Sequence, residues 1–186
     1  MATRDRILAA AYAQFYRSGF ARVSMDSIAK AAGVTKRSVY YHFESKDALA
    51  GAALENQQSH ALSLFRSWVE APAATASEFV TQLFENLDRW CRNRHWTGPG
   101  FTRMAFELAD MPGHPVRQVS RNHKRSVERW LSEKLSAYGL TDTDQAAREI
   151  VILIEGTTAL TLIHGTSHYT ESAADAARAL VNFRTR

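Results

Sequence analysis

Two short helices joined by a tight glycine turn are predicted for residues 24–46, SMDSIAKAAGVTKRSVYYHFESK, and this stretch constrains the fold of the chain more than any other. Ser24 is a good N-cap for the first helix, and Gly33 can adopt the left-handed conformation that ends it. Thr35 is the N-cap candidate of a second helix that begins at once. The pattern is that of a helix-turn-helix, although an isolated motif of this length could also be a compact hairpin whose polar residues face water.

The second helix carries cationic and aromatic side chains around one buried face, formed by Val39 and Phe43 at spacing i, i+4. A helix in the major groove reads base edges with residues near its N-terminus, so Lys36 and Arg37 are candidates for base contacts. Arginine is well shaped to bridge O6 and N7 of guanine. Phosphates favour helix N-termini, hydroxyls and cations. The candidate phosphate contacts are Ser24, Thr35, Tyr41, His42 and Lys46.

The formal charge of the chain is concentrated at the same end. Residues 1–48 hold eight Lys or Arg against four acids, whereas the remaining residues hold 15 of each sign. The whole net charge of +4 therefore lies in the first quarter of the chain. This is where an electrostatic footprint for a phosphate backbone is expected.

The first 48 or so residues resemble the DNA-binding domain of the TetR family of transcriptional regulators. The resemblance rests on a leading amphipathic helix, the Gly19-Phe20 turn, Ala32-Gly33-Val34, Tyr40-Tyr41-His42-Phe43, and Lys46 followed by Leu49. It implies a homodimer of all-helical subunits, each with a three-helix head and a larger ligand-binding and dimerisation body. It also implies that the dimer binds a palindromic double-stranded DNA operator and represses transcription. A small-molecule effector would relieve this repression, and the sequence leaves the class of effector open.

Carried over position by position, the resemblance assigns base contacts and phosphate contacts within the head. Lys36, Arg37 and Tyr40 fall where family members touch bases. The positions at which members often touch phosphates are Thr35, Ser38, Tyr41, His42 and Lys46. Asp26 departs from the family pattern, because some members place a basic residue there for base readout; Ser24 and Ser27 are then the expected DNA-facing groups of the first helix.

Beyond the head the chain reads as helix after helix, broken at Pro and Gly residues, and no long period-two pattern occurs. We expect an all-α fold of about nine helices, with a DNA-binding domain at 1–47 and a ligand-binding and dimerisation domain at 48–186. The predicted helices are 3–18, 25–32, 36–42, 46–70, 76–95, 100–110, 115–138, 142–164 and 171–184. No run of about 18 apolar residues or apolar leader is present, so we expect a cytoplasmic protein without a membrane partner.

The predicted helix at 142–164 is apolar nearly all round, which requires burial on more than one side. Packing against its own subunit on one side and against a partner on the other would explain this, and the last helix would complete a four-helix dimer interface. A central core helix in a monomer is the alternative. The candidate interface residues are Ile150, Leu153, Thr157, Leu160, Ala177, Leu180 and Val181.

The middle helices are rich in large aromatic groups, which could line an apolar effector cavity with a few polar groups to orient the ligand. Plain core packing is the alternative for most of them. The candidate pocket residues are Phe65, Trp68, Trp90, Arg103, Phe106, Glu107, His123 and Trp130.

Other chemistry has weaker support. Cys91 and His95, and His164 and His168, stand at the i, i+4 spacing of a shared metal, but neither pair has an obvious third ligand, so no metal or cofactor is expected. The chain carries no phosphate loop, nucleophile elbow or His-Glu helix motif, and we expect no enzyme. A ligand-independent DNA-binding protein and, less favoured, an all-helical enzyme remain the alternatives.

Overall fold

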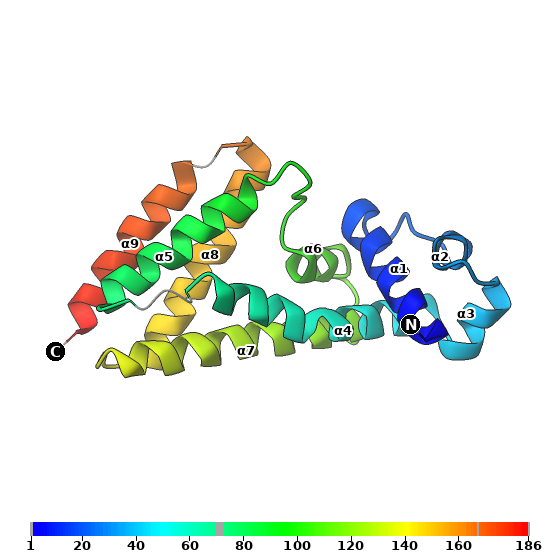
Figure 1. Cartoon of the computed structure of the whole chain (residues 1–186), viewed down its shortest axis with the longest axis horizontal. Coiled ribbons are helices and arrows are strands. Elements are labelled where there is room, and N and C mark those ends of the chain that lie inside the picture. The colour runs from blue at the N-terminus through cyan, green and yellow to red at the C-terminus, as the bar shows by residue number, and fades with distance from the viewer. Residues whose placement is uncertain (1, 70–72, 167, 186) are drawn as a thin grey trace. The chain divides into compact units, whose positions relative to one another are not determined.

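The computed structural model describes residues 2–69, 73–166 and 168–185, and in these ranges it contains nine helices and a single isolated bridge between Leu140 and Thr185 (Figure 1). The all-α prediction is confirmed. The helices are α1 (Thr3–Ser18), α2 (Met25–Ala32), α3 (Lys36–His42), α4 (Lys46–Ser67), α5 (Ala76–Cys91), α6 (Gly100–Glu107), α7 (Pro115–Ala137), α8 (Thr143–His164) and α9 (His168–Arg184).

Most helix boundaries agree with the sequence prediction, and the end of α5 shows a local cause for one of the differences. The predicted helix at 76–95 ends at Cys91, because the Asn93 side chain accepts a hydrogen bond from the His95 N–H at 3.0 Å and so replaces a helical bond. The predicted helices at 46–70 and 100–110 end earlier, at Ser67 and Glu107, and the last helix starts earlier than 171. Residue 70 and the predicted break at 71–72 lie outside the described residues.

The chain divides into two compact units that do not coincide with the predicted boundary after residue 47. The first unit, which we call the head unit, comprises residues 1–60 and 99–123. The second, the body unit, comprises residues 61–98 and 124–186. The head unit therefore includes the first part of α4, all of α6 and the first turns of α7, which sequence analysis assigned to the body.

The head unit is held by buried apolar side chains and by one arginine that crosses between helices. Ile7, Leu8, Ile28 and Val39 are fully buried or nearly so, and they join α1, α2 and α3 into one core. The Arg6 guanidinium donates to the carbonyls of residues 32 and 33 at 2.6 and 2.9 Å. These carbonyls would otherwise lack partners at the end of α2, so Arg6 fixes the turn that leads into α3.

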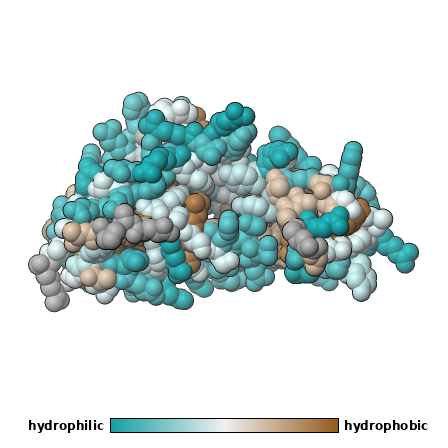
Figure 2. All heavy atoms as spheres, viewed as in Figure 1, coloured by the Kyte–Doolittle hydropathy of each residue, from teal (hydrophilic) through white to brown (hydrophobic). Residues whose placement is uncertain are grey.

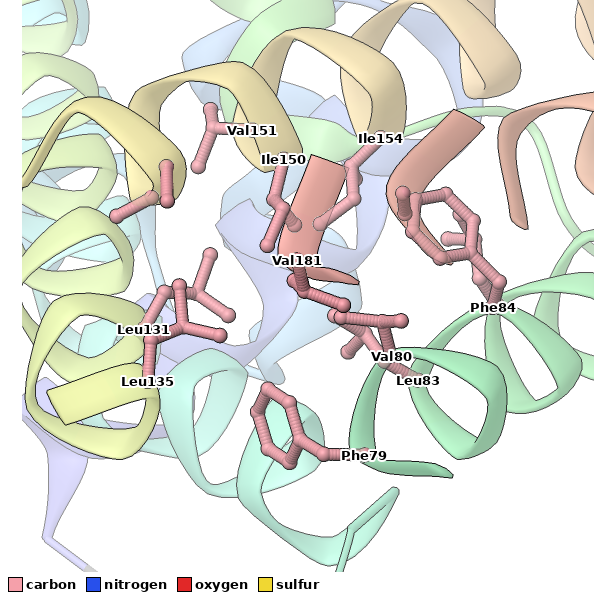
Figure 3. Close-up of a cluster of buried hydrophobic side chains, with 14 of the residues drawn as sticks. Phe79, Val80, Leu83, Phe84, Leu131, Leu135, Ile150, Val151, Ile154 and Val181 are labelled. Carbon is pink, nitrogen blue, oxygen red and sulfur yellow. The ribbon is translucent and has the colours of Figure 1, made fainter. Parts of the chain in front are cut away.

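The body unit has its own core, in which side chains from α5, α7, α8 and α9 point toward one another (Figure 3). Phe79 and Leu83 of α5 are almost completely buried, and so are Leu131 of α7 and Ile150 of α8. α9 packs on α5 and α8 and contributes Val181. Because this core is separate from that of the head unit, each unit has the apolar burial that an independent compact region needs.

Polar side chains cover most of the surface visible in Figure 2, with hydrophobic residues in small patches. Within the described ranges no helix combines the length and apolar character needed to cross a membrane.

Candidate nucleic-acid interface

The two helices of the predicted helix-turn-helix, α2 and α3, are each capped by the residues that sequence analysis named. The Ser24 hydroxyl accepts from the Ser27 N–H at 3.1 Å, and the Ser27 hydroxyl accepts from the Ser24 N–H at 3.2 Å, a complete capping box. The Thr35 hydroxyl accepts from the Ser38 N–H at 3.1 Å. Gly33 ends α2 in the left-handed conformation at φ 64°. The backbone of the motif is thus fixed by its own sequence.

Side chains at the start of α3 are exposed, as a base-reading surface requires. Lys36 and Arg37 are exposed, and 48% of Tyr40 and 85% of Tyr41 are accessible. Val39 is fully buried and Phe43 nearly so, which confirms the predicted inner face. Among the other candidate DNA contacts, Ser24 and Thr35 are exposed, whereas Ser38, His42 and Lys46 are half-buried.

An ion pair links α2 to the first residue of α3. Lys36 Nζ lies 2.6 Å from Asp26 Oδ2, and the side chains are 51% and 64% exposed. The hydrogen bond with Asp26, together with the charge of that carboxylate, raises the pKa of Lys36. The carboxylate that departs from the family pattern therefore holds one of the predicted base-reading cations. Ser27, the other expected DNA-facing residue of this helix, lies with its hydroxyl 2.8 Å from Gln14 Oε1.

The half-buried side chain of Lys46 makes an aromatic contact. Its ammonium lies 4.2 Å from the centroid of the Phe20 ring, a cation–π geometry. Partial burial lowers the pKa of Lys46. The contact with Phe20 places the charge of Lys46 at the beginning of α4.

Two of the pocket candidates, both on α6, contact the end of α1 and the turn that follows it. Glu107 accepts from the Phe20 and Ala21 N–H groups at 2.8 and 3.2 Å. Arg103, one turn earlier on α6, donates to the Tyr16 carbonyl at 3.0 Å. A Cβ at Gly19, where φ is 81°, would lie 2.6 Å from Glu107 Oε1. We call this contact the α6 clamp. Arg103 and Glu107 also line a hollow of about 350 Å³, together with residues of α1 and of the turn that follows it.

The remaining pocket candidates separate between the two units. In the body unit the rings of four candidates form an aromatic cluster: Phe65, Trp68, Trp90 and Trp130. The ring centroids lie 4.7 Å apart for Phe65 and Trp68, and 5.9 Å apart for Trp68 and Trp90. In the head unit His123 is buried and stacks on Phe101 at 4.0 Å. Phe106 is 73% exposed. The positions of these residues along the predicted helices suggested a single pocket. In the structure their side chains belong to separate groups.

The candidate interface residues are likewise divided by the direction in which α8 and α9 face the core. Ile150, Ala177 and Val181 have no exposed surface, and Thr157 has 3%. These four belong to the body core and are not available to a partner in this conformation. Leu153 and Leu180 are half-buried, and Leu160 is 39% exposed. The exposed apolar stripe on α8 contains the candidate Leu160, together with four residues that sequence analysis did not name as interface candidates: Ile152, Gly156, Ala159 and Ile163.

Cys91 and His95 do not lie on one helix, because α5 ends before residue 95, the end predicted for it. His95 lies beyond the end of α5 and accepts from Arg94. Burial raises the pKa of the Cys91 thiol to about 12. Across residues 2–69, 73–166 and 168–185 no group of three His, Cys, Asp or Glu side chains is arranged to hold a metal.

Known proteins resemble this chain in sequence at the head and in structure over its length. Residues 7–53 match the family described as bacterial regulatory proteins, tetR family. The transcriptional regulator UidR of Escherichia coli is 41% identical over 85 residues, 46% of this chain and 41% of UidR. The regulator TtgR of Pseudomonas putida is 43% identical over 96 residues, 50% of this chain and 46% of TtgR. The matched part of the chain thus spans less than half the length of these curated relatives.

Among solved structures, a TetR transcriptional regulator from Streptomyces avermitilis is 25% identical with a TM-score of 0.85, and the match covers 99% of this chain and 98% of that one. A TetR-family regulator from Streptomyces coelicolor is 24% identical with a TM-score of 0.83, over 99% and 96% of the two chains. The second likeness shows the fold alone.

Proposed function

The chain belongs to the TetR family of transcriptional regulators, and from this premise we propose that it binds a palindromic DNA operator as a homodimer and represses transcription until a small-molecule effector releases it. In this proposal residues 1–47 read DNA and residues 48–186 supply the dimer contact and the effector site. The proposal also places the protein in the cytoplasm, together with its DNA. The relatives named above are regulators, so we favour a regulator over an enzyme.

The observation that carries the DNA-binding proposal is the exposed first turn of α3. Lys36, Arg37 and Tyr40 project from a helix whose start is capped by Thr35 and whose inner face is buried by Val39. Thr35, Ser38, Tyr41, His42 and Lys46 supply hydroxyls and cations beside it for phosphates, together with Ser24 at the start of α2. A fixed backbone with exposed cationic tips is the requirement for reading bases in the major groove.

The dimer proposal is supported by the apolar stripe on α8. Ile152 and Ile163 are 68% and 73% exposed, and the stripe repeats at the spacing of one helix face. On α9, Phe183 is 87% exposed and two alanines of the same helix, Ala176 and Ala179, are exposed as well. Large apolar side chains exposed on two neighbouring helices mark an interaction surface. A two-fold copy would bury both helices in a four-helix interface and place two recognition helices on successive turns of DNA.

The effector proposal rests on the aromatic cluster of the body unit. The indole N–H groups of Trp96 and Trp130 are buried without a hydrogen-bond partner in the part of the chain that the structure describes. Trp96 packs on Trp90 at 5.6 Å, and Trp130 on Phe65 at 6.4 Å. A buried donor without a partner costs about 1–3 kcal/mol, so a planar apolar molecule with an acceptor atom would relieve that cost. If such a ligand binds more tightly to the conformation that fits DNA poorly, it lowers operator affinity. The loss equals the difference between the ligand's binding free energies for the two conformations.

Selection of bound duplexes from a random DNA pool at near-physiological salt tests the proposal, with Arg37→Ala selected in parallel. We expect one palindrome to be enriched by the wild type and broadened or lost with Arg37→Ala. Absence of enrichment above random DNA would reject sequence-specific regulation. Enrichment without release by any aromatic ligand would favour the ligand-independent DNA-binding alternative.

A further inference from the structure

The ion pair between Asp26 and Lys36 lies where the head would meet DNA, and its contribution to the fold is small. Lys36 opens α3, Asp26 is in the first turn of α2, and both side chains are more than half exposed. Ion pairs as exposed as this one contribute little to stability. The two helices are already fixed by the Ser24 capping box, the Thr35 cap and Arg6. The fold therefore does not depend on this pair, and its polar groups are available to contact DNA.

The chemistry of the pair is a donor and an acceptor held side by side. The Lys36 ammonium has three N–H donors, of which one points to Asp26 at 2.6 Å and two remain for a ligand. The carboxylate of Asp26 keeps a second oxygen as an acceptor. In the major groove a G·C pair presents the guanine O6 and N7 acceptors next to the cytosine N4 amino donor. The order of donor and acceptor in the ion pair complements that edge.

We propose that Asp26 and Lys36 act as one specificity-determining pair, in which Lys36 donates to guanine O6 or N7 and Asp26 accepts from the cytosine N4 amino group of a required G·C pair in each half-site. This inference rests on the proposed function, since it concerns the bases that the operator carries. It assigns Asp26 a base contact of its own, at a position where sequence comparison with the family left only the two serines.

The same pair lowers binding to unrelated DNA. A free lysine gains affinity from any phosphate by releasing a condensed counterion. Lys36 is engaged with Asp26, and the carboxylate itself repels phosphates. Specificity is the difference between the affinities for the operator and for unrelated DNA. The Asp26 carboxylate increases this difference in two ways, because it strengthens binding at one base edge and weakens binding elsewhere.

The test compares wild type with Asp26→Asn, Lys36→Met, the double variant and Asp5→Asn. Asp5 is an exposed acid in the first turn of α1, so Asp5→Asn removes the same charge from the same unit and leaves the ion pair intact. Each protein is used for duplex selection from a random pool. Its affinities for the selected duplex and for random duplex are then measured over a salt series, after circular dichroism has confirmed the helical content.

We expect the wild-type motif to contain a G·C pair, symmetric in the two half-sites, at which Asp26→Asn relaxes the preference by roughly five- to 150-fold. Asp26→Asn should also bind random duplex more tightly, with a salt slope steeper by about 0.9 for each phosphate newly engaged. In the Lys36→Met background the Asp26 change should have no further effect on that base pair, because the two residues act as a unit. Asp5→Asn should leave the motif unchanged.

The possible failures are distinguishable. A wild type that selects no motif refutes the proposed function itself. A wild type with a clear motif that Asp26→Asn leaves unchanged, or alters no more than Asp5→Asn does, refutes the role of Asp26. An A·T pair at the position that both Asp26→Asn and Lys36→Met relax refutes the assigned base contacts.

Discussion

At the scale of single residues, the head separates side chains that fix the backbone from side chains that face outward. Ser24, Thr35 and Arg6 bond to backbone groups at helix ends, and Lys36 and Arg37 project from the start of α3. Removing a residue of the first kind should change stability. Removing one of the second kind should change DNA binding alone.

Arg37→Ala and Lys46→Ala should weaken DNA binding in different ways. If Arg37 bridges a guanine, its loss should cost about 1–3 kcal/mol on the operator and relax one base preference. Lys46→Ala should weaken operator and random duplex alike and reduce the salt slope by about 1. Anisotropy titrations of both duplexes at several salt concentrations measure this. Equal losses on both duplexes from both variants would refute the separate roles.

Cys91 should be chemically inert in the folded protein. Burial raises the pKa of its thiol to about 12, and only the thiolate reacts with a disulfide reagent. We expect negligible labelling by 5,5′-dithiobis-(2-nitrobenzoate) at pH 8 and rapid labelling in denaturant. The thiol ionises near pH 8.5 in the unfolded chain and near 12 in the folded protein. The free energy of unfolding should therefore fall progressively as the pH rises between these values, because only the unfolded state loses the proton there. Fast labelling of the native protein would contradict the burial.

At the scale of helices, local sequence signals predicted the caps and the starts of most helices, because these depend on neighbouring residues. The end of α5 depends on the Asn93 side chain, and a pattern of apolar residues does not reveal that competition. The roles of Arg103 and Glu107 were also missed. Both contact backbone groups more than 80 residues earlier in the chain, and the sequence contains no signal for such a pairing.

The α6 clamp should stabilise the turn after α1. Glu107→Ala removes the acceptor of the Phe20 and Ala21 N–H groups, so exchange of these two amides with solvent should accelerate and the melting temperature should fall. Hydrogen exchange followed by NMR measures the effect, and Asp110→Ala, an exposed acid just beyond α6, is the control. We expect operator affinity to fall as well, because the turn positions α2. Unchanged exchange at Phe20 would show that the clamp does not hold the turn.

At the scale of the whole molecule, the sequence predicted the all-α class. It did not predict which side of α8 faces outward. A helix apolar all round offers no contrast between its faces, so Ile150 was assigned to a partner although it lies in the core. Only the packing of α5 and α9 on α8 decides the question. The exposed stripe of Ile152, Leu160 and Ile163 is the result.

Ile163→Glu should convert a dimer into a monomer. A carboxylate at a residue that is 73% exposed in a single chain costs little there, but it would be buried without a partner in a two-fold interface. Sedimentation should give twice the mass of 20.8 kDa for the wild type and the single mass for the variant. Ser63→Glu, which adds an acid at an exposed position of α4, should remain dimeric. A wild type that sediments as a monomer would contradict the dimer.

The most direct test of the central claim is the ratio of affinities for the selected palindrome and for a shuffled duplex of the same composition, measured at near-physiological salt. A sequence-specific dimeric regulator should bind the palindrome about 10³-fold tighter or more. The ratio should fall toward one when a single half-site is shuffled or when Ile163→Glu is used. A wild-type ratio near one would contradict the account, because the cations of the head would then be binding phosphates without reading bases.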